Sequence, residues 1–251
     1  MSWPGNIFLS HFGQDLDLIA PRLRRVTLGA GQVLNEPGEP IRRVYFLEGG
    51  VASKLTVFQD GTEIESALIG RKGAVGAMAA LGLRTAATRD ICHMRVSALA
   101  LDVAELAELV RRSEEIHGVL DRYCTLKTSH AIRSGACNAC HPIGQRLCRW
   151  LLTCSDVLES RDIRLPQDLF AKMLGVQRTS VNPILRRLSA QGLIELGRAR
   201  VTLLSRGGLE AQACECYHHI RELENGMWSG HSPGADRIPA RRSAANGYAL
   251  M

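Results

Sequence analysis

Residues 164–195 carry the pattern that most restricts how this chain can fold: two short runs of helical periodicity separated by a glycine. One face of the first run holds four apolar side chains, Leu169, Phe170, Met173 and Leu174. One face of the second run holds four more, Val181, Ile184, Leu185 and Leu188. Gly175 lies between the two runs and adopts the left-handed backbone conformation more easily than any other residue. The stretch therefore predicts two amphipathic helices joined by a tight turn.

The second predicted helix begins with polar side chains rather than apolar ones. Its outward positions hold Gln177, Arg178, Thr179, Ser180 and Asn182. Such side chains form hydrogen bonds with base edges and phosphates. The second helix of a helix–turn–helix is also the one that enters a major groove. We therefore interpret these five residues as candidate DNA contacts.

The charge distribution agrees with this interpretation. Between Arg164 and Arg206 there are eight cations and two anions, a local charge of +6, which equals the formal charge of the whole chain. A basic region within an otherwise balanced chain is typical of phosphate contact. The candidate phosphate contacts are Lys172, Arg186, Arg187, Arg198 and Arg200.

The first 112 residues have a different sequence pattern. After a short helical lead-in over residues 1–20, β-type runs separated by glycines continue from Arg22 to about Leu101. Short strands at intervals near ten residues predict a small barrel or a jelly-roll-like β-roll. Asp60–Gly61 predicts the turn of a hairpin within it.

From Asp102 the pattern becomes helical. A helix is predicted over 102–112, and Ser113 is the predicted N-cap of a longer helix that runs to about Ala139. Its apolar stripe contains Ile116, Val119, Leu120, Tyr123 and Leu126. This stripe either packs on the roll or faces its twin in a homodimer, and we assign it to a dimerisation helix. His141–Pro142 is the predicted hinge, since proline disfavours helix at the preceding residue.

These elements predict an α+β fold with four parts. The β-roll occupies 1–112, the dimerisation helix and hinge 113–141, and a winged helix–turn–helix domain 142–224, with a helix over about 207–223 at its end. Residues 225–251 lack periodicity and predict a disordered tail. No apolar run has membrane-spanning length and no signal-peptide pattern opens the chain, so we expect a cytoplasmic protein without a membrane partner. The eight cysteines are then expected to be mainly reduced thiols.

Several segments, taken together, resemble one family. They read VYFLEGG, IGRKGAVGAM, ACNACH, LFAKMLGVQRTSV and EAQACECY. Over residues 10–223 the chain resembles the Crp–Fnr family of bacterial transcription regulators. The resemblance implies a β-roll of the cyclic-nucleotide-binding type, a dimer helix and a C-terminal winged helix. It also implies double-stranded DNA and a second copy of the chain as partners, with RNA polymerase added if the protein is an activator.

The resemblance assigns the base-reading arginine of the recognition helix to Arg178, whose guanidinium suits guanine. A second base-reading position falls on Pro183, which lacks a backbone N–H. The helix therefore either starts near residue 178 and kinks at Pro183, or starts late with Asn182 as its N-cap. We favour the kinked helix.

The effector residues of the family are not matched. Cyclic-AMP binders have a glutamate and an adjacent Arg–Ser pair, whereas here Ala86–Ala87 fall at the pair and Arg71–Lys72 near the glutamate. Only a shifted register would bring in Arg84, Thr85, Thr88 or Arg89. We therefore do not expect cyclic-nucleotide binding. An iron–sulfur cluster near the N-terminus is not expected either, because the first cysteine is Cys92.

Cys137, Cys140 and His141 are the candidate redox or metal residues, and a zinc site would also need Cys214 or Cys216. Small packing residues at a hinge are the interpretation that we favour, so no metal or cofactor is expected. The phosphate-loop, GxSxG and HExxH patterns are absent from the sequence, and we do not expect an enzyme.

The sequence thus predicts a sequence-specific DNA-binding transcription regulator. It would act as a homodimer on a pseudo-palindromic site, with an unidentified ligand or a thiol redox signal acting through the roll and hinge. The alternative is a cyclic-nucleotide- or metal-responsive signalling module that does not bind DNA. The basic region around the predicted recognition helix argues against that alternative.

Overall fold

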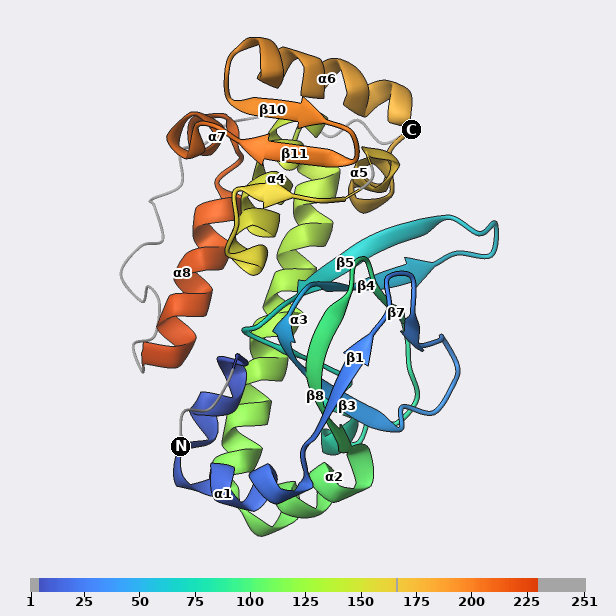
Figure 1. The fold of residues 1–251 in the computed structure, drawn as a ribbon, viewed down its shortest axis with the longest axis vertical. Helices are drawn as coiled ribbons and strands as arrows, with labels where there is room; N and C mark the ends of the chain where they lie inside the picture. Colours follow the sequence, from blue (N-terminus) through green and yellow to red (C-terminus); the bar gives the residue numbers. More distant parts are fainter. Residues whose placement is uncertain (1–4, 166, 230–251) are drawn as a thin grey trace, which may run out of the picture.

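The computed structural model describes residues 5–165 and 167–229. A β-roll occupies one side, the long helix α3 (Glu114–Cys140) runs beside it, and a smaller module of helices and a three-stranded sheet covers the far end of α3 (Figure 1). In this part of the chain no helix is both long enough and apolar enough to cross a bilayer.

Two antiparallel sheets of four strands form the roll in the described residues. The first has the order β1-β8-β3-β6, with bounds Arg24–Leu28, Val96–Asp102, Arg43–Gly49 and Ala74–Val75. The second has the order β2-β7-β4-β5, with bounds Val33–Asn35, Arg89–Cys92, Ala52–Val57 and Glu63–Ile69. In the β4–β5 hairpin Val57 lies opposite Glu63, and Gly61 has a φ of +81°. The predicted hairpin is confirmed.

Alternation along the strands divides the roll into layers. On β3, Leu47 packs between the two sheets, whereas Val44 and Phe46 face the helices on the outer side of the first sheet. This period of two is that of a strand with both faces covered. On β4, Ala52 packs between the sheets while Leu55 faces the C-terminal module. The roll is therefore covered on both outer faces.

Helices cover the first sheet. A 3₁₀ segment (Phe8–Asp15), α1 (Leu16–Ile19) and a second 3₁₀ segment (Ala20–Arg22) precede β1, a third (Ala77–Leu81) follows β6, and α2 (Val103–Arg112) follows β8. The side chain of Asp102 caps α2 by accepting a hydrogen bond from the Ala104 N–H at 2.8 Å. Ser113 Oγ caps α3 by accepting from the Ile116 N–H at 3.0 Å. The predicted cap at Ser113 is thus confirmed.

The C-terminal module contains the predicted pair of helices and a wing. Its elements are α4 (Ile143–Leu158), β9 (Asp162–Ile163), α5 (Gln167–Leu174), α6 (Arg178–Ala190), β10 (Ile194–Gly197), β11 (Arg200–Leu203), α7 (Arg206–Gln212) and α8 (Cys216–Ser229). The sheet order is β10-β11-β9, so the predicted two-stranded wing gains a short third strand.

The end of the described chain differs from the prediction in two respects. A single helix over 207–223 is wrong, because α7 and α8 are separated at 213–215. Helix α8 then continues to Ser229, so residues 225–229 belong to a helix rather than to a disordered tail. The physical reason is packing: the Trp228 ring stacks on His11, with centroids 3.9 Å apart, and contacts the helical core. The predicted tail from 230 onward lies outside the described residues.

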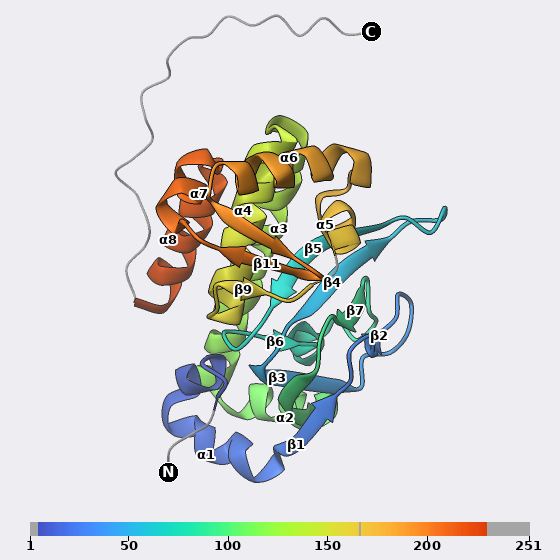
Figure 2. The same ribbon diagram turned by 45° about the horizontal axis from the view of Figure 1, so that its top comes forward.

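The C-terminal module packs directly on the roll. Val51, Leu55 and Leu68, near or on β4 and β5, belong to the same apolar cluster as Trp150 and Met173 of the module. Helix α5 lies against the β4–β5 hairpin (Figure 2). A side chain in place of Gly175 would put its Cβ 3.1 Å from Ile64 of β5, so the turn between α5 and α6 closely approaches the roll.

Candidate nucleic-acid interface

The turn between α5 and α6 has the geometry that the sequence predicts. Gly175 has a φ of +62°, the left-handed conformation. The N–H groups of Gly175 and Val176 donate to the carbonyls of Lys172 and Ala171 at 3.2 and 3.0 Å, which closes the end of α5. Helix α6 then begins at Arg178, and Gln177 in extended backbone precedes it. The glycine thus sets the angle between the two helices.

Helix α6 presents its polar side chains outward. Val181, Leu185 and Leu188 are buried in the module core, as predicted, while Ile184 is half-buried. Gln177, Arg178 and Thr179 are exposed, and Ser180 and Asn182 are half-buried. In Figure 1 α6 forms the outer edge of the molecule, at the end remote from α2. The structure therefore places the five candidate DNA contacts together at the accessible N-terminal end of α6.

Pro183 lies inside α6, which runs unbroken from Arg178 to Ala190. The late start at Asn182 is therefore wrong, and the start near residue 178 is confirmed. Because proline has no N–H, it cannot donate to the Thr179 carbonyl one turn earlier. Burial of Val181 and Leu185 on either side keeps this part of the chain helical despite the missing hydrogen bond.

The candidate phosphate contacts divide into two groups. Arg186, Arg187 and Arg198 are exposed and, like Arg178, form no ion pair within the described residues. Arg200 is half-buried and lies 3.9 Å from Glu195 across the wing. Lys172 instead pairs with Glu63 of the roll at 3.3 Å. The arginines are thus available for an outside anion, whereas Lys172 holds the module to the roll.

The predicted dimer stripe of α3 faces inward. Ile116, Val119, Leu120, Tyr123 and Leu126 are all buried in the protomer, so of the two alternatives for this stripe the structure shows packing within the chain and not contact with a second copy. The first four belong to the core between α3 and the roll, and the Tyr123 hydroxyl exchanges hydrogen bonds with the Ala74 backbone at 3.0 and 3.1 Å. The stripe packs on its own roll because the apolar outer face of the first sheet needs a cover.

The opposite face of α3 is exposed along its second half. Its residues recur at alternating spacings of three and four: Thr125, Thr128, Ile132, Gly135 and Ala139. Ile132 is 69% exposed, the largest value among the exposed large apolar side chains of the described residues. This spacing is that of a coiled-coil seam. Sequence periodicity misses the seam because all its members except Ile132 are small or weakly polar.

A cavity of about 190 Å³ lies between the roll and α3. Ala86 and Ala87 line it, together with Tyr123 and Thr128 of α3. Neither alanine offers the cation or hydroxyl that a cyclic phosphate requires. Lys54, which also borders the cavity, is paired with Asp90 at 2.8 Å.

Of the residues that a shifted register would bring in, Thr88 lines the cavity between the roll and α3. Arg89 forms ion pairs with Glu36 and Glu63, so its charge is already balanced. Arg71, near the predicted glutamate position, pairs with Glu159 at 2.7 Å. These contacts neutralise Arg71 and Arg89, whereas Lys127 of α3, which also lines the cavity, forms no ion pair within the described residues.

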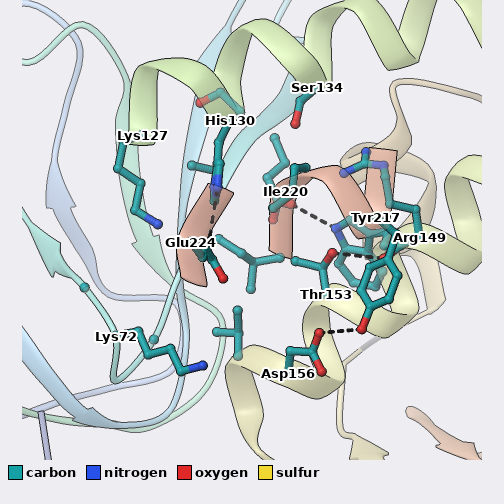
Figure 3. A pocket seen from close by; sticks show the side chains of 18 of the residues that line it. Lys72, Lys127, His130, Ser134, Arg149, Thr153, Asp156, Tyr217, Ile220 and Glu224 are labelled. Atoms are coloured by element: carbon teal, nitrogen blue, oxygen red, sulfur yellow. Dashed lines mark hydrogen bonds and ion pairs between the residues drawn. The ribbon is translucent and has the colours of Figure 1, made fainter. Parts of the chain in front are cut away.

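A second, polar cavity of about 100 Å³ lies where the roll, α3, α4 and α8 meet (Figure 3). His130 and Glu224 point toward one another across it, with Nε2 and Oε1 3.8 Å apart. The Tyr217 hydroxyl donates to Asp156 at 2.7 Å. Burial lowers the pKa of His130 to about 3, an effect reinforced by Lys127 and Arg149. No short-range sequence pattern could have found this cavity, since its walls come from distant segments.

Glu65 of β5 joins the roll to α4 beside this cavity. Its two carboxylate oxygens accept hydrogen bonds from Trp150 Nε1 at 2.8 Å and from Ser53 Oγ at 2.7 Å. Removal from water raises the pKa of Glu65 to about 7, although both hydrogen bonds and the charge of Arg149 oppose the rise. The sequence around Glu65 does not indicate its contact with Trp150, which lies 85 positions away.

The candidate redox or metal residues separate in the structure. Cys140 is exposed and takes no part in a cluster. Cys137 and His141 instead meet Cys214 and Cys216, which precede and begin α8. The Cys214 thiol hydrogen-bonds Cys137, which lowers the pKa of Cys137 and raises that of Cys214. The spacing Cys-x-Cys at 214–216 alone could not have indicated this meeting.

Comparison with known proteins identifies the C-terminal module. Residues 145–212 match the family model of the Crp-like helix-turn-helix domain. The global nitrogen regulator of Nostoc sp. is 23% identical over 180 residues, which cover 66% of this chain and 79% of that protein.

Solved structures share the fold over about three quarters of the chain. FixK2 from Bradyrhizobium japonicum superposes with a TM-score of 0.69 at 15% identity, covering 76% of this chain and 98% of that one. The c-di-GMP responsive global regulator CLP of Xanthomonas campestris gives 0.64 at 18% identity, with the same coverage. Residues 145–212 therefore form a Crp-like helix-turn-helix domain, and the chain shares with these regulators the architecture of roll, long helix and terminal helix–turn–helix module, so it is similar to the Crp–Fnr family of transcription regulators.

Proposed function

We propose that the protein regulates transcription as a homodimer that reads a pseudo-palindromic DNA site. The observation that carries this proposal is the exposed start of α6. There polar side chains share an accessible surface with Arg178, which forms no ion pair within residues 5–165 and 167–229. A guanidinium that no carboxylate neutralises keeps its full charge and all its donors for a nucleic acid.

Arg178 is the proposed base-reading residue. It opens α6 and is exposed, and an arginine at the start of a recognition helix can donate two parallel hydrogen bonds to guanine O6 and N7. Thr179, Ser180 and Asn182 would add contacts to neighbouring bases or phosphates. The roles of Arg186, Arg187, Arg198 and Arg200 would be phosphate contacts from the helix and the wing.

The exposed seam of α3 supports the homodimer. Residues at positions 125, 128, 132, 135 and 139 would meet their equivalents in a second copy, with Ile132 as the main apolar contact. Small side chains at the other positions would allow the two helices to approach closely. A two-fold axis along this seam would present two α6 helices to successive major grooves, about 34 Å apart.

We further propose that a small ligand in the cavity between the roll and α3 modulates DNA binding. Tyr123 and Thr128 border this cavity, and Thr128 also belongs to the exposed seam, so a ligand there would act directly on the dimer helix. Alanines at 86 and 87 argue against a cyclic nucleotide, and the lining is largely apolar apart from Lys54, Lys127 and a few hydroxyl groups.

Selection from a random DNA library tests the function. The reduced wild-type protein should enrich a pseudo-palindromic motif, and Arg178→Ala should lose base preference at one position in each half-site, by about 1–3 kcal/mol. Arg198→Ala should weaken binding to all sequences alike and lower the salt slope by about one. Arg111→Ala, an exposed arginine at the end of α2, is the matched control and should change neither.

Two results would contradict the proposal. If the wild-type protein enriched no motif and bound DNA without salt dependence, a signalling module that does not bind DNA would be the better description. If Arg178→Ala left the motif unchanged, base reading would have to be assigned to other residues of α6.

A further inference from the structure

Four potential metal ligands converge at the junction between α3 and α8. Cys137 and His141 lie one turn apart at the end of α3, Cys214 lies between α7 and α8, and Cys216 is the first residue of α8. One ligand atom from each of them lies within 4.8 Å of the other three. Segments some 75 residues apart in sequence thus bring three sulfurs and one imidazole nitrogen together.

The distances within this cluster match a tetrahedral site. Cys137 Sγ lies 3.5 Å from Cys214 Sγ, and Cys216 Sγ lies 3.7 Å from His141 Nδ1. With Zn–S bonds of about 2.3 Å and Zn–N bonds of about 2.0 Å, a tetrahedron has edges of about 3.8 Å between sulfurs and about 3.5 Å between sulfur and nitrogen. A disulfide would instead require about 2.0 Å between sulfurs. The observed spacing fits ligands around a shared ion.

Apolar packing does not account for these cysteines. Cys137, Cys214 and Cys216 are 0%, 3% and 1% exposed, and they form a buried cluster of their own that contains no other buried apolar side chain of the described residues. Three thiols that pack on one another gain little of the dispersion energy that branched aliphatic side chains would supply. A shared ligand is the simpler physical reason for their meeting.

The histidine is oriented as metal-bound histidines are. His141 Nε2 contacts Glu215 Oε1 at 3.1 Å, which leaves Nδ1 directed toward Cys216. A carboxylate on the far ring nitrogen fixes the tautomer and increases the basicity of the ligating nitrogen. Glu215 lies between Cys214 and Cys216 in the sequence, so the same short segment supplies two ligands and this supporting group.

We propose that Cys137, His141, Cys214 and Cys216 bind one zinc ion, which clamps the end of α3 to the start of α8. Three cysteines and one histidine make a closed structural set with no position left for substrate. The thiols would bind as thiolates and release their protons to solvent. The ion would tie the dimer helix to the end of the DNA-binding module across the predicted hinge at 141–142. This inference rests on the cluster geometry and does not depend on the proposed function.

Metal analysis of the full chain, purified without chelator, tests the site. Wild-type protein should carry about one zinc per chain, and the double variant Cys214→Ser/Cys216→Ser should carry less than about a tenth of that. Cys140→Ser is the matched control, because Cys140 is exposed on the same helix three residues from Cys137. It should keep the full zinc content.

A second measurement covers the case in which the double variant fails to fold. Cobalt added to zinc-depleted wild-type protein should give the intense visible bands of tetrahedral cobalt and the near-ultraviolet bands of cobalt–thiolate bonds, and zinc should abolish both. Folded wild-type protein that contains no zinc and shows no cobalt bands would overturn the proposal. So would a Cys137–Cys214 disulfide in the protein as purified, or loss of zinc in Cys140→Ser with retention in the double variant.

Discussion

Glu65 is the residue through which the contact between roll and module depends on pH. It accepts hydrogen bonds from Ser53 and Trp150, and the charged or titratable groups of α4 that act on it are Arg149 and Cys154. Its pKa in the folded protein is about 7, above its ordinary value of 4.5. The folded state therefore favours the protonated carboxyl group. Its contribution to stability is fully present below the ordinary pKa and is lost as the pH rises through about 7.

The substitution Glu65→Gln should remove this dependence, since glutamine is neutral and its amide oxygen can still accept a hydrogen bond from Trp150. Wild-type protein should lose thermal stability between about pH 4.5 and about pH 7.5, and the variant should lose less over the same range. Thermal unfolding of both proteins across this range measures the difference. If the melting temperatures of the two proteins changed equally with pH, the carboxyl group of Glu65 would be ionised in the folded protein throughout this range.

At the residue scale the sequence predicts exposed functional groups better than buried ones. Arg178 and its neighbours follow from the polar start of a periodic helix, a local pattern that the fold preserves. Glu65 and Cys214 could not be assigned in this way. Their partners, Trp150 and Cys137, lie in other elements, and only the packing of α4 and α8 brings them together.

Among the elements, α6 retains a weakness at Pro183. The missing N–H leaves the Thr179 carbonyl without its helical partner, and proline inside a helix costs about 3 kcal/mol. Pro183→Ala should therefore raise the free energy of unfolding by about 1–3 kcal/mol, the range allowing for the freer unfolded chain. Denaturant unfolding measures this change.

Asn182→Ala is the matched control for Pro183→Ala. Asn182 lies in the same turn as Pro183. Its replacement changes helix propensity by about 0.7 kcal/mol or less and does not restore a backbone donor. The account would be contradicted if the free energy of unfolding of Pro183→Ala were no higher than that of this control, or lower than that of wild type. Pro183 would then not destabilise α6.

Element boundaries follow from the sequence where a cap or a breaker marks them. Ser113 and Pro142 flank α3 and set its ends within two residues of the prediction. The break at 213–215 is marked by no glycine or proline, so the periodic pattern reads through it as a single helix. Strand β9, which pairs with β11, has only two residues and is too short to be predicted from apolar alternation.

For the whole molecule, the fold class and the order of its parts could be predicted, but not how the parts pack. Strand β4 reads ASKLTV and has no regular apolar alternation, so its sequence does not distinguish Ala52, which faces the other sheet, from Leu55, which faces the module. The same ambiguity affects α3. Its strongest apolar stripe covers the roll, and the face left for a second copy is the weaker one around Ile132.

The central claim is that pairing of α3 helices brings two α6 helices onto one DNA site. Sedimentation velocity of the protein, alone and with its selected duplex, tests this most directly. For wild type we predict two chains alone and two chains per duplex. Ile132→Glu should be a monomer, and Leu18→Glu, which changes an exposed leucine of α1 outside the seam, should behave as wild type. A wild-type protein that stays monomeric and binds as one chain per duplex would contradict the claim, as would an Ile132→Glu variant that remains a dimer.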